Sequence, residues 1–317
     1  MILKRSIALA VPLAALVLTG CTAIPEPAPP AAAPTLAAPV SVVNCGFDLT
    51  VDTPPQRIVS IKSTSTDLLL ALGLDDRIVG LAFQDGEQPS GLPVIAERMP
   101  SEEALLELEP DFVFSGWESA FTPEAAGDRA ELADLGVGSY VSPSACKAEG
   151  RPDTMTFDAL FDLIEEAGAI FGAPDEAAAI VAEQRDQLDA ASADTTGRTA
   201  LWWSSGTDTP YVGAGSGTPQ MVIEALGLTN IADSIAEAWS PFSWESVIGA
   251  NPDVIVLVDA SWNTAESKKA YLASNPATAS LDAVVNERYL VIPFAAGEAG
   301  VRTVPATVDL ADQLKAL

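Results

Sequence analysis

PSEEALLELEPDFVFS, at residues 100–115, has a counterpart in SWESVIGANPDVIVL, at residues 243–257. Each segment places a Glu seven residues before a Pro-Asp pair, and a run of β-branched or aromatic residues follows that pair. Glu103 and Glu245 are 142 positions apart, as are Pro110 and Pro252. A short helix followed by a buried strand fits both segments. The chain therefore makes the same helix-to-strand unit twice, with a carboxylate near each helix start.

Short apolar runs alternate with helical ones on both sides of these units. Strands are expected at residues 58–61, 78–83, 111–117 and 139–142, and again at 199–205 and 288–294. This βαβα rhythm predicts an α/β fold with parallel sheets covered by helices. Residues 154–196 have almost no strand character and read as consecutive helices. We therefore expect a Rossmann-like N-terminal lobe at 43–153, a helical segment at 154–196 that includes a long connecting helix, and a C-terminal lobe at 197–317.

The N-terminus has the order of a secretory signal peptide. MILKRS carries two positive charges, and the apolar run IALAVPLAALVL after it is too short to span a membrane comfortably. Leu18-Thr19-Gly20-Cys21 resembles the bacterial lipobox, in which cleavage precedes the Cys and the thiol is lipidated. We therefore expect a signal peptide at 1–20 and a lipid anchor on Cys21, with an ordinary secreted protein as the alternative. Residues 21–42 are rich in Pro and Ala and predict a semi-rigid tether.

Charge and histidine content exclude several classes of function. Removing the signal peptide leaves 14 basic against 44 acidic residues, a net charge of −30. Nucleic acid and anionic lipid headgroups are therefore poor partners. The sequence contains no His, which removes Ser-His-Asp and Cys-His catalysis and the His-rich sites typical of zinc binders. We expect no metal ligated by the protein and no cofactor.

Cys45 and Cys146 are the two cysteines that remain beside Cys21. An even pair outside the cytoplasm favours a disulfide, which would close a loop of about 100 residues and contribute about 4–5 kcal/mol in the chain-entropy model. A reactive or metal-binding pair is the alternative.

Two similar lobes whose strand-end loops face each other enclose a cleft where ligands bind. The candidate ligand-binding residues follow the expected strands. They are Lys62, Ser63, Thr64, Phe83, Gln84, Trp117 and Glu118 in the first lobe, and Trp203, Tyr211, Trp262, Asn263, Phe294 and Arg302 in the second.

Each of these candidates has a structural alternative. A Trp packed between a helix and a sheet is commonplace, and Trp202 and Trp203 alternate on one strand, so one of them should face the core. Lys62 and Arg302 fall at the expected cleft edges, where Arg could bind a phosphate or carboxylate bidentately. A surface salt bridge with one of the many carboxylates is the alternative for Arg302. The loop at residues 213–217 could offer amides to an anion or be a plain loop.

These features together resemble the substrate-binding lipoproteins of ABC importers. The resemblance rests on the lipobox, the two lobes, the connecting helix and the paired E-x6-P-D units, covers roughly residues 43–317, and is to the helical-backbone class that captures ferric siderophores, haem or cobalamin. Segments such as IKSTSTDLLLALGL, YVSPSACK and SSGTDTPYVGAGSGTPQ are similar to those of an actinobacterial subgroup. Membership of that subgroup implies import of a deazaflavin coenzyme precursor.

The resemblance implies partners and a location. Glu103 and Glu245 match the positions at which one Glu on each lobe docks to arginines of the membrane permease. An exposed Glu also stabilises a helix start without any partner, which is the alternative. The chain should act as a monomer, held by its lipid on the outer face of the cell membrane, and should deliver a small-molecule ligand to a permease powered by an ATPase.

The expected ligand is an organic anion, with the deazaflavin precursor favoured and a ferric siderophore, cobalamin or haem as the alternative. A flat conjugated ring could stack on the candidate aromatic side chains, and a phosphodiester could pair with Lys62 and Arg302. A lipid-anchored hydrolase is the remote alternative. It would need an acid–base pair such as Asp85 and Glu118, but no nucleophile motif accompanies them. We therefore expect a binding protein and not an enzyme.

Overall fold

The first lobe is built on a parallel sheet of five strands. The computed structural model describes residues 35–36, 38–86, 88–147 and 149–317. The strand order is β5-β4-β3-β6-β7, and every neighbouring pair is parallel. The strands are β3 (Ile58–Ile61), β4 (Ile78–Ala82), β5 (Val94–Ala96), β6 (Phe112–Ser115) and β7 (Gly138–Val141), and the helices are α1 (Ser63–Ala71), α2 (Glu102–Leu106) and α3 (Arg129–Asp134). The strands expected here are confirmed.

The second lobe has a mixed sheet, which corrects the expectation of two parallel sheets. Its order is β11-β9-β8-β12-β13, and β10 also pairs with β8. The strands β8 (Thr199–Ser205), β12 (Val254–Asp259), β13 (Tyr289–Pro293) and β10 (Thr229–Asn230) run parallel, whereas β9 (Tyr211–Gly213) and β11 (Trp239–Pro241) pair antiparallel. Only five residues connect β8 to β9, and a parallel return needs a crossover of a dozen residues or more. The helices are α6 (Thr218–Ala225), α7 (Trp244–Ala250), α8 (Ala265–Ser274), α9 (Asp282–Val285) and α10 (Thr303–Lys315).

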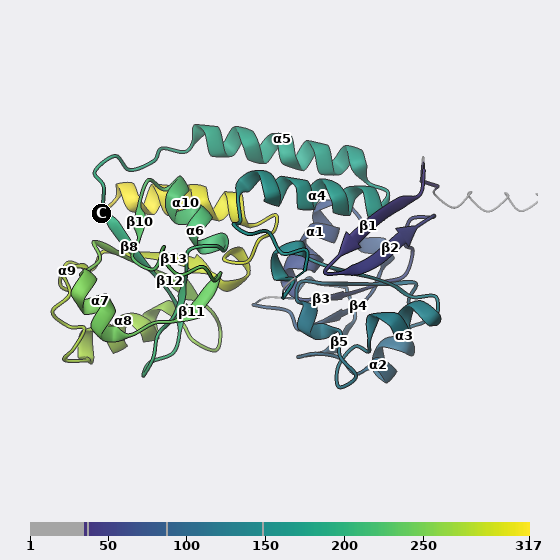
Figure 1. Cartoon of the computed structure of the whole chain (residues 1–317), viewed down its shortest axis with the longest axis horizontal. Coiled ribbons are helices and arrows are strands. Elements are labelled where there is room, and N and C mark those ends of the chain that lie inside the picture. Colours follow the sequence, from purple (N-terminus) through teal and green to yellow (C-terminus); the bar gives the residue numbers. More distant parts are fainter. Residues whose placement is uncertain (1–34, 37, 87, 148) are drawn as a thin grey trace, which may run out of the picture. The chain divides into compact units, whose positions relative to one another are not determined.

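Two helices connect the lobes. α4 (Phe157–Phe171) begins at Thr156, whose hydroxyl accepts a hydrogen bond from the amide of Ala159, and α5 (Pro174–Ala190) begins with a Pro in its first turn. Phe171 packs against Phe112 of the first sheet, with ring centroids 5.3 Å apart. α5 packs against both α4 and α10, as Figure 1 shows. The expected long connecting helix is therefore α5, about 25 Å long.

The repeated unit forms the same structure in both lobes. In α2 and α7 the capping Ser is two residues before the repeated Glu, and its hydroxyl accepts a hydrogen bond from a backbone amide. The Asp of each Pro-Asp pair holds the start of the adjacent central strand. Asp111 accepts hydrogen bonds from the amides of Gln56 and Arg57, and Asp253 accepts them from the amide and the hydroxyl of Thr199. The unit thus sets the register of the sheet in each lobe.

An antiparallel hairpin, β1 (Val40–Asn44) and β2 (Phe47–Val51), precedes the first sheet. Its first strand begins within the segment expected to be a tether, so ordered structure starts earlier in the chain than residue 43. Cys45 at the hairpin turn forms a disulfide with Cys146, which confirms the expected pairing. The side chain of Asn44 also bonds the amide and the carbonyl of Val141, which ties the hairpin to the end of β7.

Among the described residues, no helix is long and apolar enough to cross a membrane. The expected signal peptide and Cys21 lie outside the described residues.

The disulfide should contribute strongly to stability. Cys45 and Cys146 are separated by 101 positions, so the double variant Cys45→Ala/Cys146→Ala should lose about 4–5 kcal/mol of unfolding free energy. Urea unfolding measures this loss. Reducing the wild-type protein should reproduce it, and the reductant should leave the double variant unchanged. A loss below about 1 kcal/mol would show that the loop closure does not constrain the unfolded chain.

Candidate functional site

Two cavities lie between the lobes. The large cavity has a volume of about 1120 Å³ and the small cavity about 220 Å³. Each is lined by residues that follow strands of both sheets, as a cleft between two α/β lobes requires. The large cavity is lined mainly by Asp67, Phe83, Gln84, Asp85, Glu97, Arg98, Asp259, Trp262, Phe294 and Arg302. The small cavity is lined mainly by Thr64, Trp117, Ser142, Ser144, Arg151, Met155, Ser216, Thr218, Trp239 and Glu298.

Lys62 is fully buried between these cavities. Its ammonium is 2.5 Å from the carboxylate of Asp85. It also lies 4.4 Å from the ring centroid of Phe83, 4.0 Å from Trp117 and 5.1 Å from Phe294. A buried ammonium needs such compensation, because its desolvation is costly. Lys62 therefore joins aromatic rings of both lobes, and its charge is neutralised within the protein.

The backbone supports this arrangement. Lys62 has φ 82° and Phe83 has φ 50°, and each residue directly follows a strand of the first sheet. Non-glycine residues in this region of φ cost about 1–3 kcal/mol and persist only where the surroundings hold them.

Arg302 is also paired. Its guanidinium is 2.5 Å from Asp67 of α1, an ion pair between the two lobes. Burial raises the pKa of Asp67, and the hydrogen bond from Arg302 opposes this shift. This pairing matches the salt-bridge alternative considered for Arg302. Both cations that were expected to bind an anionic ligand, Lys62 and Arg302, are therefore already paired with a carboxylate.

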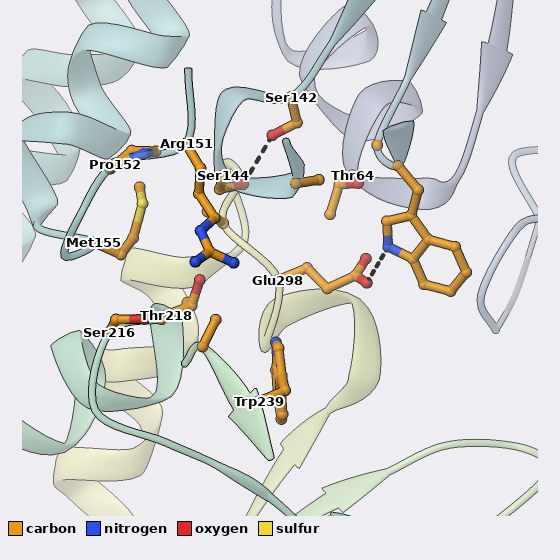
Figure 2. Close-up of a pocket in the computed structure, with 16 residues that line it drawn as sticks. Thr64, Ser142, Ser144, Arg151, Pro152, Met155, Ser216, Thr218, Trp239 and Glu298 are labelled. Atoms are coloured by element: carbon orange, nitrogen blue, oxygen red, sulfur yellow. Dashed lines mark hydrogen bonds between the residues drawn. The ribbon is translucent and has the colours of Figure 1, made fainter. Parts of the chain in front are cut away.

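Glu298 makes a second contact between the lobes. Its Oε1 accepts a 2.7 Å hydrogen bond from the indole N–H of Trp117, shown in Figure 2. Its Oε2 is buried and has no hydrogen-bond partner within the described chain. Burial raises the pKa of Glu298 to about 7. Asp85 reinforces the shift, while Lys62 and the Trp117 hydrogen bond oppose it.

The chain at residues 142–147 and 151–152 forms one wall of the small cavity. The hydroxyl groups of Ser142 and Ser144 share a 3.0 Å hydrogen bond there, and Arg151 lines the same cavity. The disulfide anchors this segment at Cys146, and the carboxylate of Glu118 accepts a hydrogen bond from the next amide, that of Lys147. The hairpin and its disulfide thus help to position the wall.

The structure brings most of the candidate residues to the two cavities. Phe83, Gln84, Trp262, Phe294 and Arg302 line the large cavity, and Thr64 and Trp117 line the small one. Ser63 lies beside the Lys62 cluster, where its hydroxyl accepts a hydrogen bond from the amide of Asp85.

Six candidate residues line neither cavity. Lys62 and Ser63 belong to the buried cluster described above. Glu118 is bonded to Lys147, as described above. Trp203 is buried in the core, where it packs on Trp244 and Tyr271, because the inward pleat of β8 directs it against α7 and α8. Tyr211 stacks behind Trp239, with centroids 6.4 Å apart. The side chain of Asn263 accepts a hydrogen bond from Ser267 at the start of α8.

The lining residues that sequence reasoning did not select include Arg151, Trp239 and Glu298. Glu298 could have been found from its position. It lies between the candidates Phe294 and Arg302 and is the only acidic residue in that stretch of the sequence. Three amides of the loop at residues 213–217 are not available to an anion. The amides of Ala214, Gly215 and Ser216 donate to backbone carbonyls of residues 235–238. Its glycines are needed because a Cβ on Gly215 would lie 1.9 Å from the carbonyl oxygen of Asp233.

Among the described residues, no group of three or more His, Cys, Asp or Glu could hold a metal ion. Glu103 and Glu245 are both exposed in the first turns of their helices.

Glu298 should make stability depend on pH. Because its pKa is about 7 in the folded protein and 4.5 ordinarily, the folded state binds a proton that the unfolded chain has lost between those values. Stability should therefore fall as pH rises from about 4.5 to 7. Glu298→Gln keeps the acceptor for Trp117 and removes the charge, so it should gain up to about 3 kcal/mol over wild type at pH 8 and little at pH 4.5. Urea midpoints at both pH values measure this difference, and an equal effect at both would contradict it.

Comparisons with known proteins agree with this geometry. The model of a family described as "Periplasmic binding protein" matches residues 58–296. An uncharacterized ABC transporter substrate-binding lipoprotein of Bacillus subtilis, YvrC, is 23% identical over 277 residues, which cover 84% of this chain and 82% of that protein.

Two solved structures are 25% identical to the chain. A periplasmic binding protein from Veillonella parvula has a TM-score of 0.78 and covers 88% of this chain and 98% of its own. A protein described as an ABC-type Fe3+-hydroxamate transport system, from Saccharomonospora viridis, has a TM-score of 0.74 with 87% and 98% covered. The periplasmic haem-binding protein HutB of Vibrio cholerae shares the fold, with a TM-score of 0.68, 23% identity and 82% and 98% covered. With its family model spanning both lobes and the cleft between them, the chain belongs to the periplasmic binding protein family.

Proposed function

We propose that this chain is the extracytoplasmic substrate-binding protein of an ABC importer and that its cargo is a bulky ferric hydroxamate chelate. The observation that carries the proposal is the large cavity between the lobes, with its aromatic rings and predominantly acidic lining. Its volume of about 1120 Å³ slightly exceeds the usual range for ligand pockets, about 300–1,000 Å³, and therefore suits a bulky cargo. The Bacillus and Saccharomonospora proteins, by their descriptions, support the transport role.

The charge of the large cavity favours a neutral or cationic cargo. Four carboxylates line it against two guanidinium groups, and one of those, Arg302, is already paired with Asp67. Three hydroxamates balance the charge of Fe3+, so a ferric trihydroxamate core carries no net charge. The deazaflavin precursor that the sequence favoured bears a phosphodiester, which would meet carboxylates such as Asp259 and Glu97 that line the same cavity. We therefore place the siderophore before the deazaflavin.

A chelated iron also suits the lack of ligating side chains. Haem is held by axial His, Cys, Met or Tyr, and none of these residue types is among the described residues lining the large cavity. A hydroxamate cargo arrives with its iron already coordinated. Its apolar arms can pack on Trp262 and Phe294, whose rings meet edge to face with centroids 5.8 Å apart.

The remaining parts of the proposal concern location and partners. Cys21 would carry the lipid that holds the protein on the outer face of the membrane. Glu103 and Glu245 would dock the two lobes to the permease, and the monomer would be the functional unit. No catalytic step is part of this function.

The cargo can be identified by titration. We expect saturable quenching of tryptophan fluorescence by a ferric trihydroxamate, and none by a deazaflavin phosphodiester, haem or cobalamin. Trp262 is 61% exposed at the cavity, so Trp262→Ala should weaken chelate binding by up to about 10-fold. Leu135→Ala, which removes an exposed side chain away from both cavities, is the control. Binding of the deazaflavin but not the chelate would return the assignment to the anionic ligand.

Docking can be separated from binding. Glu103→Ala/Glu245→Ala should abolish cargo uptake by cells while leaving affinity for the cargo unchanged, because both side chains are exposed and line neither cavity. Glu107→Ala/Glu266→Ala removes two other exposed helix carboxylates and should leave uptake intact. Normal uptake by the first double variant would refute the docking role.

A further inference from the structure

We propose that the small cavity is a second binding site, specific for a small zwitterion that carries a primary ammonium and a carboxylate, the chemistry of a free α-amino acid. This site is independent of the proposed chelate cargo. Its volume of about 220 Å³ exceeds the ~150 Å³ of an engineered cavity that holds benzene. The space therefore suits a molecule of several non-hydrogen atoms.

The acidic end of the site is Glu298. Its Oε1 is occupied by the indole of Trp117, whereas its Oε2 is buried without a partner in the part of the chain that the structure describes. Oγ1 of Thr64, a side chain only 7% exposed, is likewise buried and unpartnered there. A buried acceptor without a donor costs about 1–3 kcal/mol, more when charged. An ammonium has three N–H donors and could satisfy both oxygens.

The nearest internal cation does not fill this role. Lys62 is held in its ion pair with Asp85, and its ammonium packs on the ring of Trp117. Trp239, which also lines the cavity, adds a second aromatic side chain beside which a bound ammonium could be stabilised. The acidic end therefore has an acceptor set, with aromatic walls, that suits a ligand cation.

The basic end of the site is Arg151. Its side chain is one-third exposed, and its salt bridge to Glu237 is a loose 3.6 Å. In Figure 2 the Glu298 carboxylate points toward Trp117 and away from the Arg151 guanidinium. No ion pair joins them among the salt bridges of the described residues. Two opposite charges that line one cavity without pairing are complementary to a ligand carrying both charges.

Hydroxyl groups complete the lining between the two ends. Ser142 and Ser144 belong to the first lobe, and Ser216 and Thr218 to the second. Their side chains can donate or accept, which suits a carboxylate held next to Arg151. Because Arg151 and Glu298 also come from different lobes, a bound zwitterion would bridge the two lobes.

The test uses calorimetric and fluorescence titration at pH 8, where the Glu298 carboxyl is mostly ionised. The probes are L-alanine and L-leucine, with N-acetyl-L-alanine, which lacks the ammonium, and L-alaninamide, which lacks the carboxylate. L-alanine should bind to the wild-type protein, and each modified probe should bind at least 10-fold more weakly than L-alanine. L-leucine tests whether the cavity also admits a longer side chain. Because these comparisons use the wild-type protein, they do not depend on how any variant folds.

Variants then locate the site. Glu298→Gln and Arg151→Gln should each weaken amino-acid binding about 10-fold to 100-fold, the effect of losing a charged hydrogen bond. Glu266→Gln and Arg185→Gln, which remove exposed charges away from the cavity, should have no effect. The proposal is overturned if L-alanine does not bind at millimolar concentration, if the modified probes bind as tightly as L-alanine, or if both cavity variants bind L-alanine normally. A chelate titration run in parallel tests the cargo separately, since its result does not depend on the amino-acid probes.

Discussion

The cleft depends on one buried charge, the ammonium of Lys62. It is fully removed from solvent at the end of a central strand, and its ion pair with Asp85 and three aromatic rings offset the cost of burial. Two of those rings belong to the first lobe and one, Phe294, to the second. Trp117 in turn bonds Glu298 of the second lobe. The same cluster therefore joins the lobes and contributes lining residues to both cavities.

This arrangement explains why the cleft does not suit the anion that the sequence favoured. The sequence has few basic residues, and two of those at the cleft, Lys62 and Arg302, are each paired with a carboxylate of the first lobe. The large cavity is left with more acidic than basic groups, so a chelate with a neutral core fits it better than a phosphodiester. A cargo whose iron is already coordinated needs no ligand from the protein. It is therefore compatible with a sequence that contains no His.

Local patterns predicted the fold well. The two E-x6-P-D segments reveal themselves by spacing alone, and the strands at 58–61 and 112–115 follow from short apolar runs. The role of Asp111 and Asp253 was not visible, because each binds a strand start more than fifty positions away. The hairpin of β1 and β2 was overlooked next to a Pro/Ala-rich stretch, although its exposed and buried residues alternate around a Cys-Gly turn. The antiparallel pairing of β9 follows from the short connection between β8 and β9. The sequence contained this signal, but the prediction did not use it.

Side-chain partners were the least predictable part of the site. Residue type and position after a strand correctly brought Phe83, Trp262 and Phe294 to the large cavity. The same rule also selected Trp203, which the pleat of β8 turns into the core. It missed Glu298, because nothing local to a carboxylate shows that a Trp from 181 positions away will bury it. Periodicity fixes which element a residue belongs to, but pairing across a cleft depends on how the two lobes meet.

The most direct test of the central claim is a crystal structure of the protein soaked with a ferric trihydroxamate, with anomalous data collected at the iron edge. The account predicts a single iron peak in the large cavity near Trp262 and Phe294, with no protein side chain in its coordination sphere. An iron peak ligated by carboxylates of the protein, or located outside this cavity, would contradict it.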